Sequence, residues 1–97
     1  MSDETMTRIA LAARLDSTAA PQLESDLKSA ARPDLEIDAS EVTFLGGRCL
    51  QLLLAAQKTA VERGGAMSIV RPSQSFREML VRLGAASFFK EDLEKSA

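Results

Sequence analysis

The chain has 97 residues, a length that suits one small domain with a single hydrophobic core. Hydrophobic residues make up 45% of it and charged residues 27%, which is typical of a globular protein. A net charge of −2, without a basic cluster and without Tyr or Trp, argues against a nucleic-acid-binding surface.

Several absences narrow the class of protein further. No apolar stretch approaches the roughly 20 residues that span a bilayer, and the acidic start Met1–Glu4 lacks the basic and apolar segments of a signal peptide. The single cysteine, Cys49, cannot form an internal disulfide, and His is absent, so no zinc site is expected. We therefore predict a cytoplasmic protein with no direct membrane insertion, no catalytic residues, no metal and no cofactor.

The first part of the chain predicts a strand followed by a helix. Apolar residues alternate from Ile9 to Leu15, which predicts one half-buried strand. Asp16–Thr18 supplies candidate caps for a helix, Pro21 suits its first turn, and Arg32–Asp34 stops it. The apolar stripe of this helix consists of Leu23, Leu27, Ala30 and Ala31.

The middle of the chain predicts a short strand, a turn and a long helix. Leu35 and Ile37 alternate with acidic residues, and 42–44 is a brief extended segment that leads into Gly46-Gly47. A helix is expected from Arg48 to Glu62 and ends at Gly64-Gly65 in the left-handed conformation. Its apolar stripe consists of Leu50, Leu53, Leu54, Ala60 and Val61.

The last part predicts a strand at 67–70 and two helices. Pro72-Ser73 caps the first helix and Gly84 closes it. Phe88 and Phe89 lie on a short final helix, where core packing is favoured over an exposed apolar patch for a partner. The apolar positions of these helices are Phe76, Met79, Leu80, Leu83 and Leu93.

This order of elements predicts an α/β fold in which helical crossovers join strands of a small, mostly parallel or mixed sheet packed against about four helices. We expect a single domain over residues 1–97, with its core at about 5–95. The loops that follow parallel strands gather along one edge, where binding sites usually form. Here that edge carries the segments 16–18, 43–48 and 71–75.

Three segments in this order resemble the STAS family, the domain of anti-sigma-factor antagonists and sulphate-transporter tails. Leu15–Leu23 resembles the family's first strand-to-helix corner, and Leu35–Leu45 resembles its central strand and turn. Val70–Leu80, continued by Leu83–Ala85, resembles its late strand and helix. The resemblance covers nearly the whole chain and implies a domain that works by docking onto another protein.

One turn departs from the family pattern. Signalling antagonists of the family carry Asp-Ser-Ser/Thr-Gly-Leu at the start of the second helix, and their kinase phosphorylates the first hydroxyl of that turn. The matching residues here are Gly46-Gly47-Arg48-Cys49-Leu50, with Gly47 at the phosphorylated position. The resemblance therefore predicts no phosphosite at this turn.

The variant turn resembles that of STAS proteins encoded among the chemotaxis genes of alphaproteobacteria, the CheS type. This resemblance implies an accessory protein that binds the histidine kinase CheA and helps to dephosphorylate a response regulator that acts as a phosphate sink. The alternatives are an anti-sigma-factor antagonist in a partner-switching pathway and a STAS subunit of a membrane transport complex. The oligomeric state stays open. The expected partner-binding residues are Ser17, Thr18, Thr43, Gly46, Gly47, Arg48 and Gln51.

Other features of this region admit two interpretations. Gly46-Gly47 could bind an anion at a helix N-terminus, but a tight strand-to-helix corner is favoured. Cys49 could be a reactive thiol, but a buried apolar role is favoured. Ser40 and Thr43 could accept phosphate, but bracing of the turn is favoured.

Overall fold

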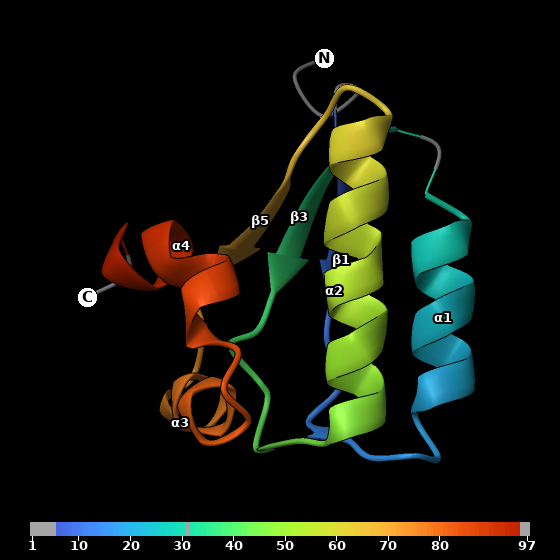
Figure 1. Ribbon diagram of the computed structural model, residues 1–97. Helices are drawn as coiled ribbons and strands as arrows, with labels where there is room; N and C mark the ends of the chain where they lie inside the picture. Colours follow the sequence, from blue (N-terminus) through green and yellow to red (C-terminus); the bar gives the residue numbers. More distant parts are fainter. Residues whose placement is uncertain (1–5, 31, 96–97) are drawn as a thin grey trace.

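The computed structural model describes residues 6–30 and 32–95 of the chain (Figure 1). It confirms the predicted α/β class, with parallel strands and four α-helices. The elements in chain order are β1 (Met6–Ala10), β2 (Arg14–Leu15), α1 (Ala20–Lys28), β3 (Asp34–Asp38), β4 (Phe44–Leu45), α2 (Gly47–Glu62), β5 (Met67–Val70), α3 (Gln74–Arg82), the 3₁₀ turn η2 (Ala86–Phe89) and α4 (Lys90–Lys95).

The strands that the structure describes form two parallel sheets. One has the order β1-β3-β5, and the other pairs β2 with β4. The prediction of one continuous strand from Ile9 to Leu15 is wrong, and Ala13 is exposed rather than buried. The strand breaks because its partner changes: Leu11 N–H still donates to Asp38 at the end of β3, whereas the Ala13 carbonyl accepts from Thr43 beside β4.

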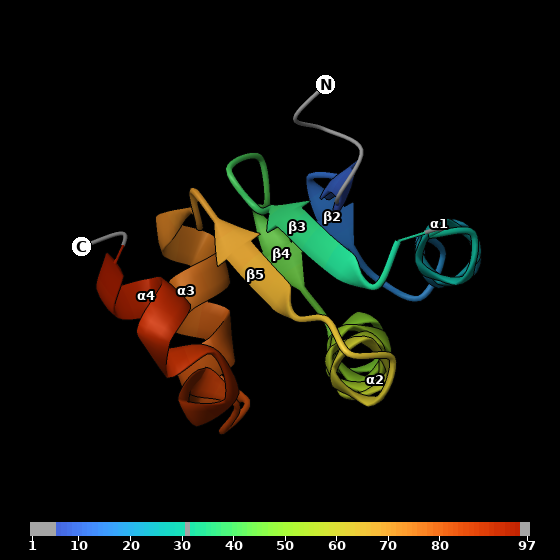
Figure 2. The ribbon, with the colours of Figure 1, turned by 90° about the horizontal axis from the view of Figure 1, so that it is seen from above.

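The helices lie on two sides of the strands. Viewed from above, α1 and α2 lie side by side, and α3 and α4 lie together beyond β5 (Figure 2). The edge of β5 is covered, because Ile69 N–H donates to the Asp92 carboxylate of α4 at 3.1 Å. This contact satisfies a backbone donor that would otherwise be exposed at a sheet edge.

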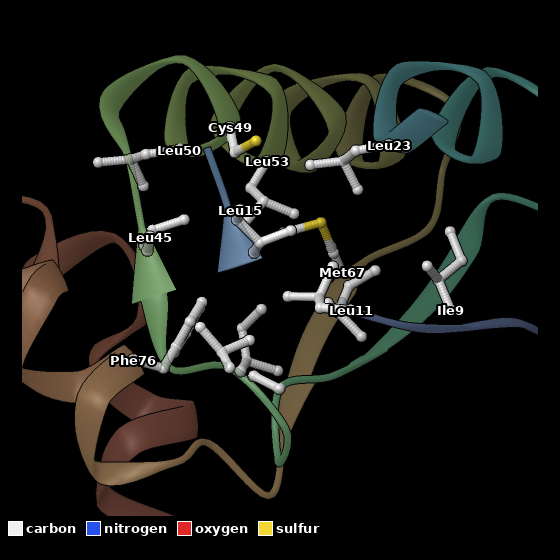
Figure 3. Close-up of a cluster of buried hydrophobic side chains, with 14 of the residues drawn as sticks. Ile9, Leu11, Leu15, Leu23, Leu45, Cys49, Leu50, Leu53, Met67 and Phe76 are labelled. Carbon is white, nitrogen blue, oxygen red and sulfur yellow. The ribbon is translucent and has the colours of Figure 1, made fainter. Parts of the chain in front are cut away.

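The hydrophobic core lies between α2, α3 and the strands. Leu53 on α2 and Phe76 on α3 are fully buried, and both lie in this cluster (Figure 3). Cys49 is also fully buried, as predicted. The other side chains labelled in this cluster are Ile9, Leu11, Leu15, Leu23, Leu45, Leu50 and Met67.

Three residues at predicted apolar positions are exposed instead: Val61, Leu83 and Phe88. Leu83, the residue that follows α3, is 43% exposed. Val61 has 63% of its surface exposed, because it lies about 100° around α2 from buried Ala60 and so points away from the strands. Phe88 is 56% exposed while its neighbour Phe89 is only 1% exposed. The short 3₁₀ turn directs these two adjacent rings to different sides.

The start and end of α1 differ from the prediction. Its N-cap is Ala19, with no side-chain cap, so the expected cap from Asp16–Thr18 is wrong. Asp16 instead accepts two hydrogen bonds from Thr18 and forms a local turn. Pro21 occupies the first turn as predicted, but the helix ends at Lys28, before Arg32–Asp34. Ala30 is buried beyond this end, and Ala31 lies outside the described residues.

The remaining helix ends largely follow the sequence. Ser73 caps α3 by accepting from Phe76 N–H at 3.0 Å, and Gly84 ends the helix with a φ of +75°. Gly64 follows α2 with a φ of +88°. Gly65 is required for another reason: a Cβ there would lie 2.5 Å from the Pro33 carbonyl group.

Candidate functional site

The pairing of β2 with β4 brings two loops to one corner of the molecule. Leu15 pairs with Leu45, and Gly46 N–H donates to the Leu15 carbonyl at 2.9 Å. The chain therefore leaves both strands at the same point, where α2 begins. The Cys49 thiol donates to the Asp16 carbonyl at 3.5 Å and joins the first turn of α2 to the loop before α1.

The two glycines at this corner have different surroundings. Gly46 is the N-cap of α2 and is half-buried, and a Cβ there would lie 3.3 Å from both the Leu15 carbonyl oxygen and the Phe44 ring. Gly47 is exposed, has helical geometry, and would meet nothing within 4 Å if it carried a Cβ. Only Gly46 is therefore favoured as glycine by close contact, which fits a tight strand-to-helix corner.

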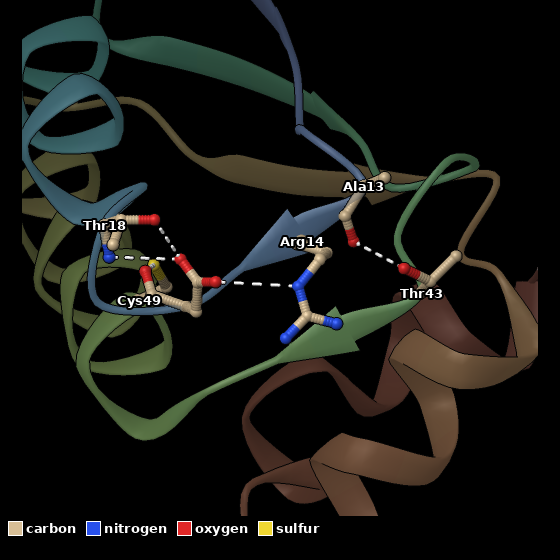
Figure 4. Close-up of polar contacts among 6 residues, drawn as sticks. Ala13, Arg14, Thr18, Thr43 and Cys49 are labelled. Atoms are coloured by element: carbon tan, nitrogen blue, oxygen red, sulfur yellow. Dashed lines mark hydrogen bonds and ion pairs between the residues drawn. The ribbon is translucent and has the colours of Figure 1, made fainter.

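The loop after β2 is held by a carboxylate. Asp16 Oδ1 accepts from the Thr18 hydroxyl at 2.6 Å and from the Thr18 backbone N–H at 3.1 Å (Figure 4). The hydrogen bond from the hydroxyl is the main cause that lowers the pKa of Asp16 below its ordinary value. Asp16 is therefore a charged brace for this loop, and it leaves Ser17 and Thr18 exposed.

Arg14 and Phe44 flank the same corner, although the sequence did not single them out as functional. The Arg14 guanidinium lies 5.2 Å from the centroid of the Phe44 ring, and its Nε lies 3.6 Å from Asp16 Oδ2. Arg14 is exposed and Phe44 is half-buried, whereas their neighbours Leu15 and Leu45 are buried. Strand alternation at these positions was the signal that could have identified this solvent-facing pair.

Thr43 lies at the other end of β4, before the strand rather than after it. Its hydroxyl donates to the Ala13 carbonyl at 3.0 Å and closes the gap between the two strands (Figure 4). This contact agrees with the favoured interpretation of Thr43 as a brace. Ser40 is exposed, and its backbone N–H donates to Asp38 Oδ1 at 2.9 Å.

An ion pair crosses the ends of β3 and β5 on the same edge of the strands. Arg71 Nη2 donates to Asp38 Oδ2 at 2.6 Å. This contact, helped by the hydrogen bond from Ser40, lowers the pKa of Asp38 to about 2. Arg71 has a φ of +50°, which places this non-glycine residue in the left-handed region.

The structure thus brings six of the seven expected contact residues to one corner, and it leaves Thr43 at the far end of β4. Five of the six are exposed, and Gly46 is half-buried. Gln51 belongs to the group because it lies one helical turn after Gly47 on α2. We call this set the corner surface; it consists of Ser17, Thr18, Gly46, Gly47, Arg48 and Gln51.

The surroundings of Cys49 disfavour a reactive thiol at the corner. Burial raises the pKa of the Cys49 thiol, and nearby Asp16 raises it further, so the nucleophilic thiolate is disfavoured. Within residues 6–30 and 32–95, no three His, Cys, Asp or Glu side chains come together in a way that could hold a metal ion. In the same part of the chain, no helix is long and apolar enough to cross a membrane.

Comparison with known proteins agrees with this architecture. The sequence profile of a family described as "Mlab, STAS domain" matches residues 2–91. A search of curated protein sequences finds no significant match.

Two solved structures have the same fold. The anti-sigma factor antagonist SpoIIAA in its unphosphorylated form superposes with a TM-score of 0.71 at 16% identity, covering 98% of this chain and 90% of that one. The Bacillus cell fate determinant SpoIIAA in the phosphorylated form superposes with a TM-score of 0.70 at 17% identity, covering 100% and 96%.

Proposed function

The chain belongs to the STAS-domain family, and we propose that it is a non-catalytic interaction module that binds a protein partner through the corner surface. The observation that carries this proposal is the exposed corner itself. Ser17, Thr18, Gly47 and Arg48 are exposed there. The β2–β4 pairing and the Asp16–Thr18 hydrogen bonds hold the backbone of the corner in place. A preorganised surface loses less conformational entropy on binding.

We propose further that the partner is a CheA-type histidine kinase and that the complex speeds loss of phosphate from a phosphate-sink response regulator. This proposal rests on the resemblance of the turn Gly46–Leu50 to that of CheS-type proteins. It is supported by the exposure of Arg48 and by a family-typical phosphorylation position that holds Gly47. Regulation would then lie in the kinase.

The first test is a calorimetric titration of the chemotaxis kinase of the same organism with the purified protein. We expect Arg48→Glu to weaken the complex about tenfold, equivalent to about 1.4 kcal/mol, because it reverses a charge beside the contact. Arg82→Glu, at an exposed position at the end of α3, is the matched control. Unchanged affinity for Arg48→Glu would remove Arg48 from the interface.

The second test measures the proposed effect on phosphate flow. The regulator is phosphorylated by the kinase, ATP is removed, and the loss of its phosphate is followed with and without this protein. We expect faster loss with the wild-type protein and a smaller effect with Arg48→Glu. Equal rates with and without the protein would rule out the role in dephosphorylation while leaving the binding proposal intact.

A second candidate function is a phosphorylated anti-sigma-factor antagonist, favoured by the fold shared with SpoIIAA. In this chain Ser40 or Thr43 would have to accept the phosphate. The Thr43 hydroxyl donates to Ala13, so its phosphorylation would break the contact between β2 and β4.

Incubation with ATP and the cognate kinase, followed by intact-mass measurement, separates these candidates. We expect no added phosphate on the wild-type chain. Gly47→Ser is the matched positive control, since a side chain fits at Gly47 without close contact. Phosphate on Ser40 or Thr43 of the wild-type protein would favour the antagonist.

A third candidate is a STAS subunit of a membrane transport complex. The corner surface would then bind a transporter component rather than a kinase. The neighbouring genes distinguish these cases: chemotaxis genes support the first candidate and transporter genes support the third.

A further inference from the structure

A second exposed surface lies on the later half of α2, away from the corner surface at its start (Figure 1). Here α2 and the 3₁₀ turn η2 border a shallow depression of about 520 Å³. The hydrogen bond from Gln57 Nε2 to the Phe88 carbonyl, at 3.0 Å, holds the two elements together. We call this surface the α2–η2 face; the residues that matter are Leu54, Lys58, Val61, Glu62, Ala66 and Phe88.

The face carries exposed apolar side chains from two elements, α2 and η2. Four large hydrophobic side chains are exposed in the residues that the structure describes, and two of them, Val61 and Phe88, border this single depression. Their exposed fractions are 63% and 56%. Half-buried Leu54 adds to the same surface. Contiguous apolar surface of this kind marks interaction sites on otherwise polar proteins.

The charges on the face favour a partner of one kind. Lys58 and Glu62 lie one helical turn apart on α2 and are both exposed, so the face carries one charge of each sign. Such a surface has no net charge that would select an acidic or a basic partner. Two copies of the face complement each other if Lys58 of each copy lies opposite Glu62 of the other, which requires the order of the two charges to be reversed in the second copy.

A two-fold axis produces this reversal. Across such an axis two α2 helices run antiparallel, and an axis beside position 60 places Lys58 opposite Glu62 of the second copy. The same arrangement brings the two copies of Val61 together near the axis. Both ion pairs and the apolar centre then form at once.

We propose that the α2–η2 face binds a second copy of this chain in an antiparallel, two-fold dimer. A standard interface buries roughly 800 Å² per partner, and we expect a contact made by one helix face and one aromatic ring to be smaller. The dimer is therefore weak and forms at high protein concentration. It leaves the corner surface accessible, because that surface lies at the other end of α2 (Figure 1).

Sedimentation equilibrium over a range of protein concentrations tests this proposal. We expect the mass to rise above the 10.5 kDa of one chain for the wild type and to stay at one chain for Val61→Glu. Val81→Glu is the matched control, since Val81 on α3 is 68% exposed but lies outside the depression. It should self-associate like the wild type.

Charge reversal supplies a second readout that does not depend on apolar contact. Lys58→Glu alone and Glu62→Lys alone should each weaken self-association, because each puts like charges opposite each other. The double variant should restore it. Loss in both single variants with recovery in the double variant is expected only if the two residues face each other across the axis.

Three outcomes would overturn the dimer. They are a wild-type mass of one chain at every concentration, self-association that Val61→Glu does not weaken, and a double charge variant that fails to recover. If Val61→Glu leaves self-association unchanged and weakens the kinase complex, the second of these outcomes holds and the face belongs to the kinase. The kinase titration with Arg48→Glu is a separate measurement, so the two proposals fail independently.

Discussion

At the end of β3, Asp38 accepts hydrogen bonds from Arg71 on one oxygen and from the Ser40 backbone on the other. Because these contacts favour the ionised carboxylate, the pKa of Asp38 falls from 3.8 to about 2 on folding. The charged form therefore stabilises the native state at pH values above 3.8. This contribution declines as the pH falls from 3.8 toward 2 and is absent below that range.

We expect Asp38→Asn to lower the free energy of unfolding at neutral pH by about 1 kcal/mol or less, as is usual for a partly exposed ion pair. The difference from wild type should shrink between pH 3.8 and about 2. Urea unfolding across this range measures it, with Glu41→Gln as a control for loss of an exposed charge in the same loop. A difference independent of pH would contradict the assignment.

Ser73 connects two elements through one hydroxyl. It caps α3 by accepting from Phe76 N–H and donates to the Val42 carbonyl at 2.6 Å. We expect Ser73→Ala to cost about 1–2 kcal/mol of stability, measured by thermal or urea unfolding. Exposed Ser87→Ala is the control and should cost less. The Pro72-Ser73 sequence predicted the cap, but the bond to Val42 joins residues 31 positions apart and depends on the fold.

At the scale of elements, the turn from α2 into β5 depends on the absence of a side chain. A Cβ at Gly65 would lie 2.5 Å from the Pro33 carbonyl and 2.8 Å from Asp34 Oδ1. Asp34 Oδ1 accepts a hydrogen bond from Ala66 N–H. We expect Gly65→Ala to destabilise the protein by about 1–3 kcal/mol through this overpacking. Gly47→Ala, at an open helical position, should leave stability unchanged or slightly raised. Equal effects in urea unfolding would argue against the close contact.

The element order was predictable because apolar periodicity differs between strands and helices. The break between β1 and β2 was not, since Leu11, Ala13 and Leu15 still alternate in the sequence. What interrupts the strand is the change of partner from β3 to β4, a long-range event. The exposure of Val61 and Phe88 was missed for a similar reason: periodicity identifies apolar positions but does not show which of them another element covers.

At the scale of the molecule, α2 joins the corner surface to the core. Leu53 is fully buried in the cluster that also contains Leu15, Leu45 and Met67 (Figure 3). We expect Leu53→Ala to lower the free energy of unfolding by about 2–5 kcal/mol because it leaves a cavity. Half-buried Leu52→Ala on the same helix should cost less in the same urea experiment. Similar costs would show that the core can collapse around the lost side chain.

The sequence predicted the place of the candidate site better than it predicted which residues form the site. Parallel strands place their following loops at one edge, so Ser17 and Gly47 could be expected near each other. Arg14 and Phe44 could not be added, because their contact requires the register in which these two residues pair. Thr43 was assigned to the site from its position before the turn, but its hydroxyl is directed to Ala13.

Cys49 is the only thiol in the sequence, and it is buried beneath the loop that contains Asp16. A thiol reagent in solution can reach it only after the first turn of α2 separates from that loop. The rate of labelling in the native protein therefore measures how often the corner opens, without any introduced probe. A partner that docks across the corner should slow this labelling, so one natural sulfur atom can follow both the local motion and the binding.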